Sequence, residues 1–127
     1  MKNIVAYCRT ATELQDYSSI KRQAKLIRRY ARNRGIRIQK IYSDPAQSGV
    51  SLNRPGLKRL LSECRTGNIG TIIVRDPDRL ARDWVLLVSI LAKLEKYGVR
   101  VEFSTEHGRI NFRFQKLLWE PSKSITV

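Results

Sequence analysis

The sequence contains few of the residues that build disulfide frameworks or metal centres. Its 127 residues include two cysteines, Cys8 and Cys64, and one histidine, His107. The cysteines lie far apart and lack a Cys-x-x-Cys spacing, so both are interpreted as small packing residues. A metal site of the Cys and His type needs more ligands than these three residues offer. The sequence therefore predicts no metal and no cofactor.

Long apolar runs are also missing, and acidic residues are scarce. No run is long enough to cross a bilayer, and the N-terminus lacks the apolar core of a signal peptide, so a cytoplasmic location is expected. Only 11 Asp and Glu stand against 25 Lys and Arg, which gives a net charge of +14. This excess favours a polyanionic partner, and nucleic acid is preferred over an anionic membrane surface.

Strand-like and helix-like segments alternate along the chain. Apolar, β-rich runs lie at 4–7, 36–42, 71–74 and 99–103. Helical patterns lie between them, at about 19–34, at about 55–64 and in a segment that ends at Tyr97. The alternation predicts an α/β fold, with one domain and a mostly parallel four- to five-stranded sheet flanked by helices. The domain is expected over residues 1–105, followed by a short C-terminal extension over residues 106–127.

The last helical pattern carries an apolar stripe that predicts core packing. The stripe consists of Trp84, Leu87, Val88, Leu91 and Leu94. Either Asp78 or Asp83 can cap the start of this helix.

Charged residues follow the predicted strands. Arg9 comes after the first strand, Asp44 after the second, and Asp76, Asp78 and Arg79 after the third. Since the carboxyl ends of parallel strands meet at one edge of a sheet, this edge is the predicted functional site.

Arg79 and Arg82 are three residues apart, so they share one face if the chain is helical there. Two guanidiniums on one face form a fork that suits a phosphate group. A solvated charge run is the alternative interpretation of this cluster.

The first helical pattern and the strand after it are strongly basic. Between Lys21 and Lys40 there are nine basic residues and no acidic one. Part of this surface is a solvated helix face, but the mutual repulsion of so many like charges favours a nucleic-acid contact. The helical residues predicted to make it are Lys21, Arg22, Lys25, Arg28, Arg29 and Arg32.

Four ordered motifs resemble the catalytic domain of the serine recombinases, the resolvase/invertase family. The motifs are Tyr7-Cys-Arg-Thr-Ala-Thr12 with Gln15, Ser19-Ile-Lys-Arg-Gln23, Asp44 with Ser48-Gly49 and Arg54-Pro-Gly-Leu57, and Asp78-Arg-Leu-Ala-Arg82. Each motif alone is weak, but the four together cover residues 3–105 in family-like order.

The resemblance implies metal-free cleavage and rejoining of double-stranded DNA by a serine hydroxyl, within a homodimer or higher homo-oligomer. It implies that Arg9, Arg54, Arg79 and Arg82 stabilise the phosphate charge in the transition state. Asp78 resembles an aspartate that orients this cluster, Asp44 is similarly placed, and Gln15 and Gln23 are expected to form hydrogen bonds within the site. Family members usually continue into a DNA-binding module, and residues 106–127 are not expected to form one.

The chain departs from the family at the nucleophile, because Ala11 occupies the position of the serine. A methyl group cannot attack phosphorus. Ala11 is then an engineered change, or a natural one in an inactive relative, or Thr10 or Thr12 replaces the serine. The expected function is site-specific DNA recombination with a disabled nucleophile. The alternatives are a non-catalytic DNA-binding or regulatory relative on the same fold and a basic α/β protein that binds RNA.

Overall fold

The computed structural model describes residues 2–10, 17–45 and 53–104. Its elements are β1 (Asn3–Arg9), α1 (Tyr17–Asn33), β2 (Lys40–Asp44), α2 (Pro55–Arg65), β3 (Ile69–Val74), α3 (Pro77–Leu80), α4 (Trp84–Lys96) and β4 (Arg100–Phe103). The predicted extension over residues 106–127 lies outside the described residues. No helix in the described part of the chain is both long enough and apolar enough to cross a membrane.

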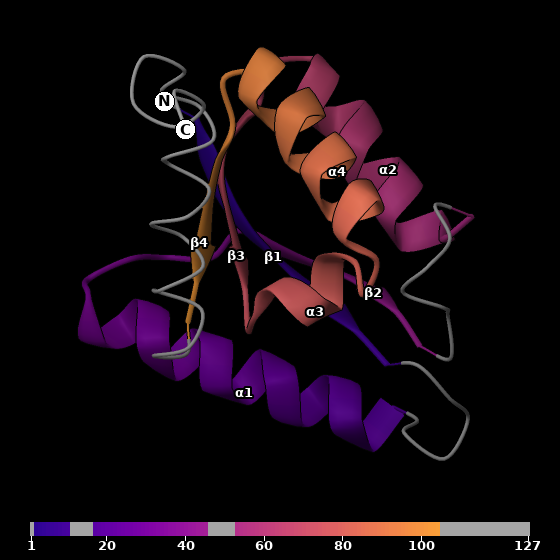
Figure 1. The fold of residues 1–127 in the computed structure, drawn as a ribbon. Helices are drawn as coiled ribbons and strands as arrows, with labels where there is room; N and C mark the ends of the chain where they lie inside the picture. Colours follow the sequence, from indigo (N-terminus) through magenta and orange to yellow (C-terminus); the bar gives the residue numbers. More distant parts are fainter. Residues whose placement is uncertain (1, 11–16, 46–52, 105–127) are drawn as a thin grey trace, which may run out of the picture.

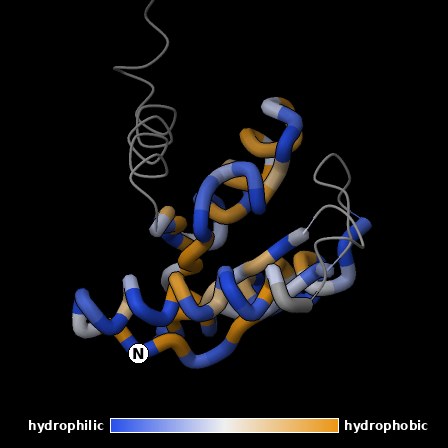
Figure 2. The backbone as a smooth tube through the Cα atoms, turned by 90° about the horizontal axis from the view of Figure 1, so that it is seen from below, coloured by the Kyte–Doolittle hydropathy of each residue, from blue (hydrophilic) through white to orange (hydrophobic). Residues whose placement is uncertain are grey.

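The four strands form one parallel sheet in the order β2-β1-β3-β4, which confirms the predicted α/β architecture. Helix α1 covers one face of the sheet, and α2 and α4 cover the other (Figure 1). Hydrophobic and hydrophilic stretches alternate along the tube in Figure 2, as expected for helices that present one face to a sheet.

The central strand β1 is buried on both faces because its side chains alternate. Val5 and Tyr7 belong to the core beneath α2 and α4, whereas Ala6 and Cys8 belong to the core beneath α1. Both cysteines are buried and free, which confirms that they are packing residues and not a disulfide.

The segment 36–42 is only partly a strand, because β2 begins at Lys40. Gly35 ends the α1 region with φ of 69°, a backbone conformation that glycine adopts at little cost. Ile36 and Ile38 then pack against the core beneath α1. Their alternation therefore reflects packing against a helix, and not a longer strand.

The predicted core position of Trp84 is wrong. The buried side chains of α4 are Leu87, Ile90, Leu91 and Leu94, and the Trp84 side chain is 53% exposed. Asp83 caps this helix by accepting a hydrogen bond from the amide of Leu86 at 3.1 Å. Trp84 is therefore the first helical residue, and it lies in a terminal turn that the core does not cover.

Candidate active site

Four segments that are distant in sequence meet at the carboxyl edge of the sheet. Arg9 ends β1, Asp44 ends β2, Arg54 directly precedes α2, and α3 follows β3. Arg9 contacts the backbone of α3 and Asp44 contacts the first turn of α2, so the edge is one connected cluster. We call this group of residues, together with Gln23, the carboxyl edge.

Arg9 joins β1 to α3. Its side chain is fully buried, and its Nε and Nη2 donate hydrogen bonds to the carbonyls of Arg79 at 3.1 Å and Asp78 at 2.6 Å. Burial, and secondly the nearby charge of Arg54, lowers the pKa of the Arg9 guanidinium below its ordinary value. Arg9 therefore contributes to the fold of this edge as well as to its positive charge.

Arg54 makes a second connection to the same turn. Its guanidinium is buried and donates hydrogen bonds to the carbonyl of Leu80, to the carbonyl of Arg79 at 3.3 Å and to the Tyr7 hydroxyl at 3.4 Å. The guanidinium carbon also lies 5.9 Å from the centre of the Tyr7 ring. Two buried guanidiniums thus hold the backbone carbonyls of α3.

Asp44 holds the start of α2 in place. Its Oδ1 accepts from the amide of Gly56 at 2.6 Å, and its Oδ2 accepts from the amide of Leu57 at 2.8 Å and from the Tyr7 hydroxyl at 2.7 Å. Two amides at a helix N-terminus are a favourable site for a carboxylate. A side chain at Gly56 would meet Asp44, since an added Cβ would lie 2.9 Å from its Oδ2. The sequence Arg54-Pro-Gly-Leu57 therefore fits Asp44 closely.

Gln23 completes the hydrogen bonding of β1. The pairing of β1 with β3 ends at Tyr7 and Val74, two residues before β1 itself ends. Gln23 reaches from α1 to Arg9, where its Oε1 accepts from the backbone amide at 3.2 Å and its Nε2 donates to the carbonyl at 2.9 Å. The side chain thus replaces a missing strand neighbour.

Arg79 and Asp76 form an incompletely paired part of the edge. The Nη1 of Arg79 donates to the Arg9 carbonyl at 3.1 Å, but its Nε is buried and has no hydrogen-bond partner among the described residues. The Oδ1 of Asp76 is buried and unpaired in the same sense, and its Oδ2 lies 3.9 Å from the Arg79 Nε. Buried polar atoms without partners are rare, and they concentrate at functional sites.

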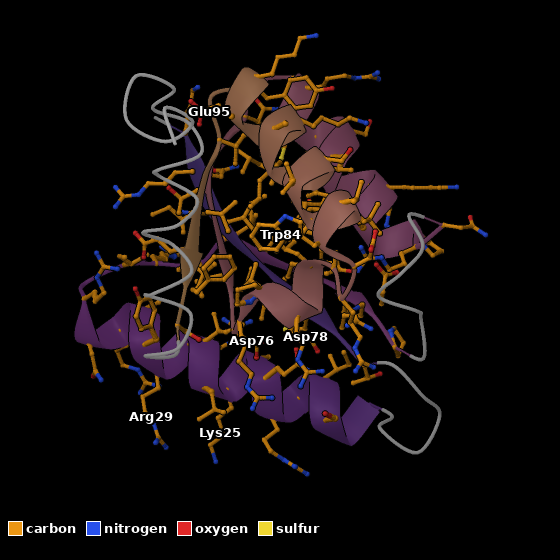
Figure 3. All side chains as sticks on the ribbon, in the orientation of Figure 1. Lys25, Arg29, Asp76, Asp78, Trp84 and Glu95 are labelled. Carbon is orange, nitrogen blue, oxygen red and sulfur yellow. The ribbon has the colours of Figure 1, made fainter. Side chains whose placement is uncertain are left out.

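Arg79 and Arg82 do not share a helical face, so the predicted fork on one helix is wrong. Helix α3 ends at Leu80, and Ala81 is extended with φ of −162°. Arg82 therefore lies outside the helix, where its side chain is 59% exposed and its Nε lies 3.5 Å from the Asp78 Oδ1. Figure 3 shows Asp76 and Asp78 beside α3. The extended residue between two short helical segments rotates Arg82 away from Arg79.

Two predicted site residues, Ala11 and Gln15, lie outside the described residues. The last described residue before them is Thr10, which is buried and whose amide donates to the Asp44 carbonyl at 3.2 Å. The chain thus enters position 11 directly from the carboxyl edge.

The structure matches the edge to a known family. The family model described as "Resolvase, N terminal domain" matches residues 4–120. The chain belongs to the resolvase family.

Named relatives of this resolvase-family domain include two transposon proteins. It is 41% identical to the Transposon Tn21 resolvase of Escherichia coli over 73 residues, which cover 58% of this chain and 38% of that protein. It is 30% identical to the Transposon Tn3 resolvase of Escherichia coli over 100 residues, which cover 79% of this chain and 49% of that protein. The match thus spans less than half the length of each of these relatives.

A solved structure confirms the fold of the domain. The N-terminal catalytic domain of TP901-1 integrase superposes with a TM-score of 0.75 at 21% identity, over 99% of this chain and 100% of that one. At this identity the similarity establishes the serine recombinase fold.

Tyr7 and Asp76 are residues of this resolvase-family edge that the sequence analysis did not select as site residues. Burial raises the pKa of Tyr7 above its ordinary value, and the Asp44 carboxylate adds to the effect. Tyr7 stands two residues before Arg9 on the same strand, and this alternation is the signal that could have identified it. No sequence signal shows that the Asp76 carboxylate is only half paired, because that depends on the position of α3.

Proposed function

We propose that this domain carries the DNA cleavage and rejoining chemistry of a site-specific recombinase, and that Ala11 disables it. The observation that supports this most is the convergence of Arg9, Arg54 and Arg79 next to the point where the chain enters position 11. Recombinases of this kind act on double-stranded DNA, and we include assembly with a second copy of the chain in the proposal.

The step needs an oxygen nucleophile at position 11. A serine Oγ there would form a bond to a phosphodiester phosphorus while the bond from phosphorus to the 3′ oxygen breaks. The hydroxyl proton leaves to a base, and the 3′ oxygen takes up a proton. Rejoining reverses the two bond changes, so no metal or external energy source is needed. Alanine has no oxygen to begin the sequence.

The guanidiniums of the edge would stabilise the negative charge that develops on the non-bridging oxygens. Arg79 is the best candidate for direct contact with phosphate, because its present hydrogen bonds leave a donor unused. Arg9 and Arg54 act first by holding α3, and their charges add to the field at the same edge.

A second candidate function is a non-catalytic DNA-binding or regulatory protein on this fold. Ala11 and the net charge of +14 favour it, since both are consistent with binding without cleavage. The two candidates differ in whether restoring a hydroxyl at position 11 restores chemistry.

Covalent capture of DNA tests the proposal. The chain and its Ala11→Ser variant are incubated with pools of nicked duplexes, and protein–DNA adducts that survive denaturation are measured. We expect adducts only with Ala11→Ser, linked through the 5′ phosphate. The combined Ala11→Ser/Arg79→Gln variant should form fewer adducts, because it lacks a donor for the phosphate.

Other outcomes contradict the proposal in distinct ways. Adducts with the chain as it stands would identify another nucleophile, and Thr10→Val and Thr12→Val variants would locate it. Adducts with neither protein, under conditions where both bind DNA, would favour the non-catalytic function.

A further inference from the structure

The six cations of α1 divide into two groups around the helix. Each residue turns an α-helix by about 100°. Arg22 and Arg29 each lie two positions after a buried isoleucine, so they face away from the sheet. Lys21, Arg28 and Arg32 each lie one position after a buried residue, so they occupy the flank of the helix.

The flank cations form one continuous stripe. Lys21, Lys25, Arg28 and Arg32 are spaced by four, three and four residues, which is the spacing of neighbours along one side of a helix. The stripe extends over about 16 Å of helix. Lys25 lies at its outer margin, and Figure 3 shows Lys25 and Arg29 extending from α1 away from the sheet.

The stripe ends in a hollow of about 440 Å³ between α1 and the segment 36–38. The hollow is lined by Arg28, Ala31, Arg32, Ile36, Arg37 and Ile38. Three guanidiniums from two segments of the chain therefore converge on a partly apolar floor, and no acidic side chain lines it. We call Arg28, Arg32 and Arg37 the flank arginines.

The flank arginines have no internal counter-charge. Within residues 2–10, 17–45 and 53–104, none of them forms a hydrogen bond or an ion pair through its side chain. Arg34, on the opposite flank of the helix, shows the contrast. Its guanidinium is paired with Glu102 and lies 5.3 Å from the centre of the Tyr30 ring. Three unpaired like charges around one hollow repel one another, and a bound anion would relieve that repulsion.

The hollow is separate from the carboxyl edge. The residue that follows its floor, Gln39, donates its backbone amide to the carbonyl of Ile4 at 2.9 Å. Ile4 lies near the start of β1, and the five-residue rise from Ile4 to Arg9 amounts to about 17 Å. A ligand in the hollow would thus leave the carboxyl edge free.

We propose that the flank arginines and the lysine stripe bind the phosphodiester backbone of duplex DNA at a second place on the domain, with one phosphate in the hollow. The length of the stripe favours a chain of phosphates over a single small anion. Lysine and arginine contacts to phosphate carry no sequence information, so this site adds affinity and orientation and not specificity. The choice of DNA as the polyanion rests on the proposed function.

The test compares two double variants of the same helix that remove equal charge. Arg28→Gln/Arg32→Gln removes flank charges, and Arg22→Gln/Arg29→Gln removes outward charges. Glutamine keeps the helix propensity, and all four positions are exposed, so both proteins should fold. Affinity for a duplex of mixed sequence is measured by fluorescence anisotropy between 50 and 200 mM salt, as approximate working limits.

We expect the flank variant to flatten the slope of log affinity against log salt by about 2 and to lower affinity at the low-salt end about tenfold. The outward variant should change both quantities by less than half as much, and Arg37→Gln should flatten the slope by about 1. The measurement uses the chain with Ala11 in place, so its result does not depend on whether position 11 supports cleavage.

Three results would overturn the inference. Equal losses from both double variants would mean that the domain binds through its overall charge. Unchanged binding in the flank variant would remove the site altogether. Saturable binding of inorganic phosphate at the flank arginines, seen by NMR and not displaced by duplex DNA, would assign the hollow to a small anion.

Discussion

The carboxyl edge and the α1 flank use the same side chain in opposite ways. At the edge, Arg9 and Arg54 are fully buried, and their guanidiniums donate to backbone carbonyls of α3. On the flank, Arg28 and Arg32 are exposed and have no ion pair among the described residues. The charge is the same in both places, and the surroundings determine what it can do.

The difference follows from the cost of burying charge. A guanidinium can leave water only if acceptors replace the hydrogen bonds that it loses, so the edge arginines must also be structural. An exposed guanidinium has no such requirement, and it is available to an external anion. Substitutions at the edge should therefore change stability, whereas substitutions on the flank should change binding.

The largest expected effect comes from Arg54. Arg54→Met should lower the free energy of unfolding by about 3–5 kcal/mol, because the carbonyls of Leu80 and Arg79 would lose a charged donor. Urea denaturation followed by circular dichroism measures this change. The matched Arg32→Met variant should change it by less than about 0.5 kcal/mol. Similar losses at both positions would abolish the distinction between the two regions.

Asp44 should give the next largest effect. Asp44→Asn should cost about 2–3 kcal/mol, because an amide cannot accept from both backbone N–H groups of α2 and from the Tyr7 hydroxyl. Asp78→Asn is the control, since its side chain is 56% exposed and should matter little to folding. The same urea titrations apply. An unchanged midpoint for Asp44→Asn would show that the carboxylate does not hold α2.

Gln23 tests whether a side chain supports the edge from α1. Gln23→Ala should cost about 2 kcal/mol, since it removes two hydrogen bonds to the buried backbone of Arg9. Gln39→Ala is a matched control. Gln39 accepts from the amide of Ile4 at 2.7 Å in an exposed setting where water can replace it, so its loss should be smaller. Thermal unfolding of the two variants side by side would reveal an inverted order.

Cys8 lies on β1 and responds to the charges of both regions. Burial raises the pKa of its thiol from an ordinary 9.0 to about 12, while Arg79 from the edge and Arg28 from the flank oppose the shift. Above pH 9.0 the unfolded thiol ionises first, so its contribution to stability is complete below that pH and is lost as the pH rises toward about 12.

The chain should therefore lose about 1.4 kcal/mol more stability than Cys8→Ala between pH values of about 8 and 10. Urea denaturation at both pH values measures the difference, and the shared titration of other groups cancels in the comparison. Equal losses in the two proteins would mean that the native thiol is accessible to water.

Much of the fold could be predicted because its signals are local. The β-branched runs and the apolar spacing of Ile20, Ile27 and Ala31 depend only on neighbours in sequence. The errors arose where tertiary contacts compete with local pattern. Ile36 and Ile38 read as a strand but pack against a helix, and Trp84 fits an apolar stripe but lies in an uncovered terminal turn.

The sequence by itself determined the α/β class, the carboxyl edge and the excess of positive charge, because alternation and composition are written along the chain. Only the tertiary structure decided which arginines are buried and which are unpaired. That distinction depends on acceptors from segments far apart in sequence, such as the α3 carbonyls that meet Arg9 and Arg54. A linear pattern shows that an arginine is present, but the folded chain decides whether its hydrogen bonds are already used.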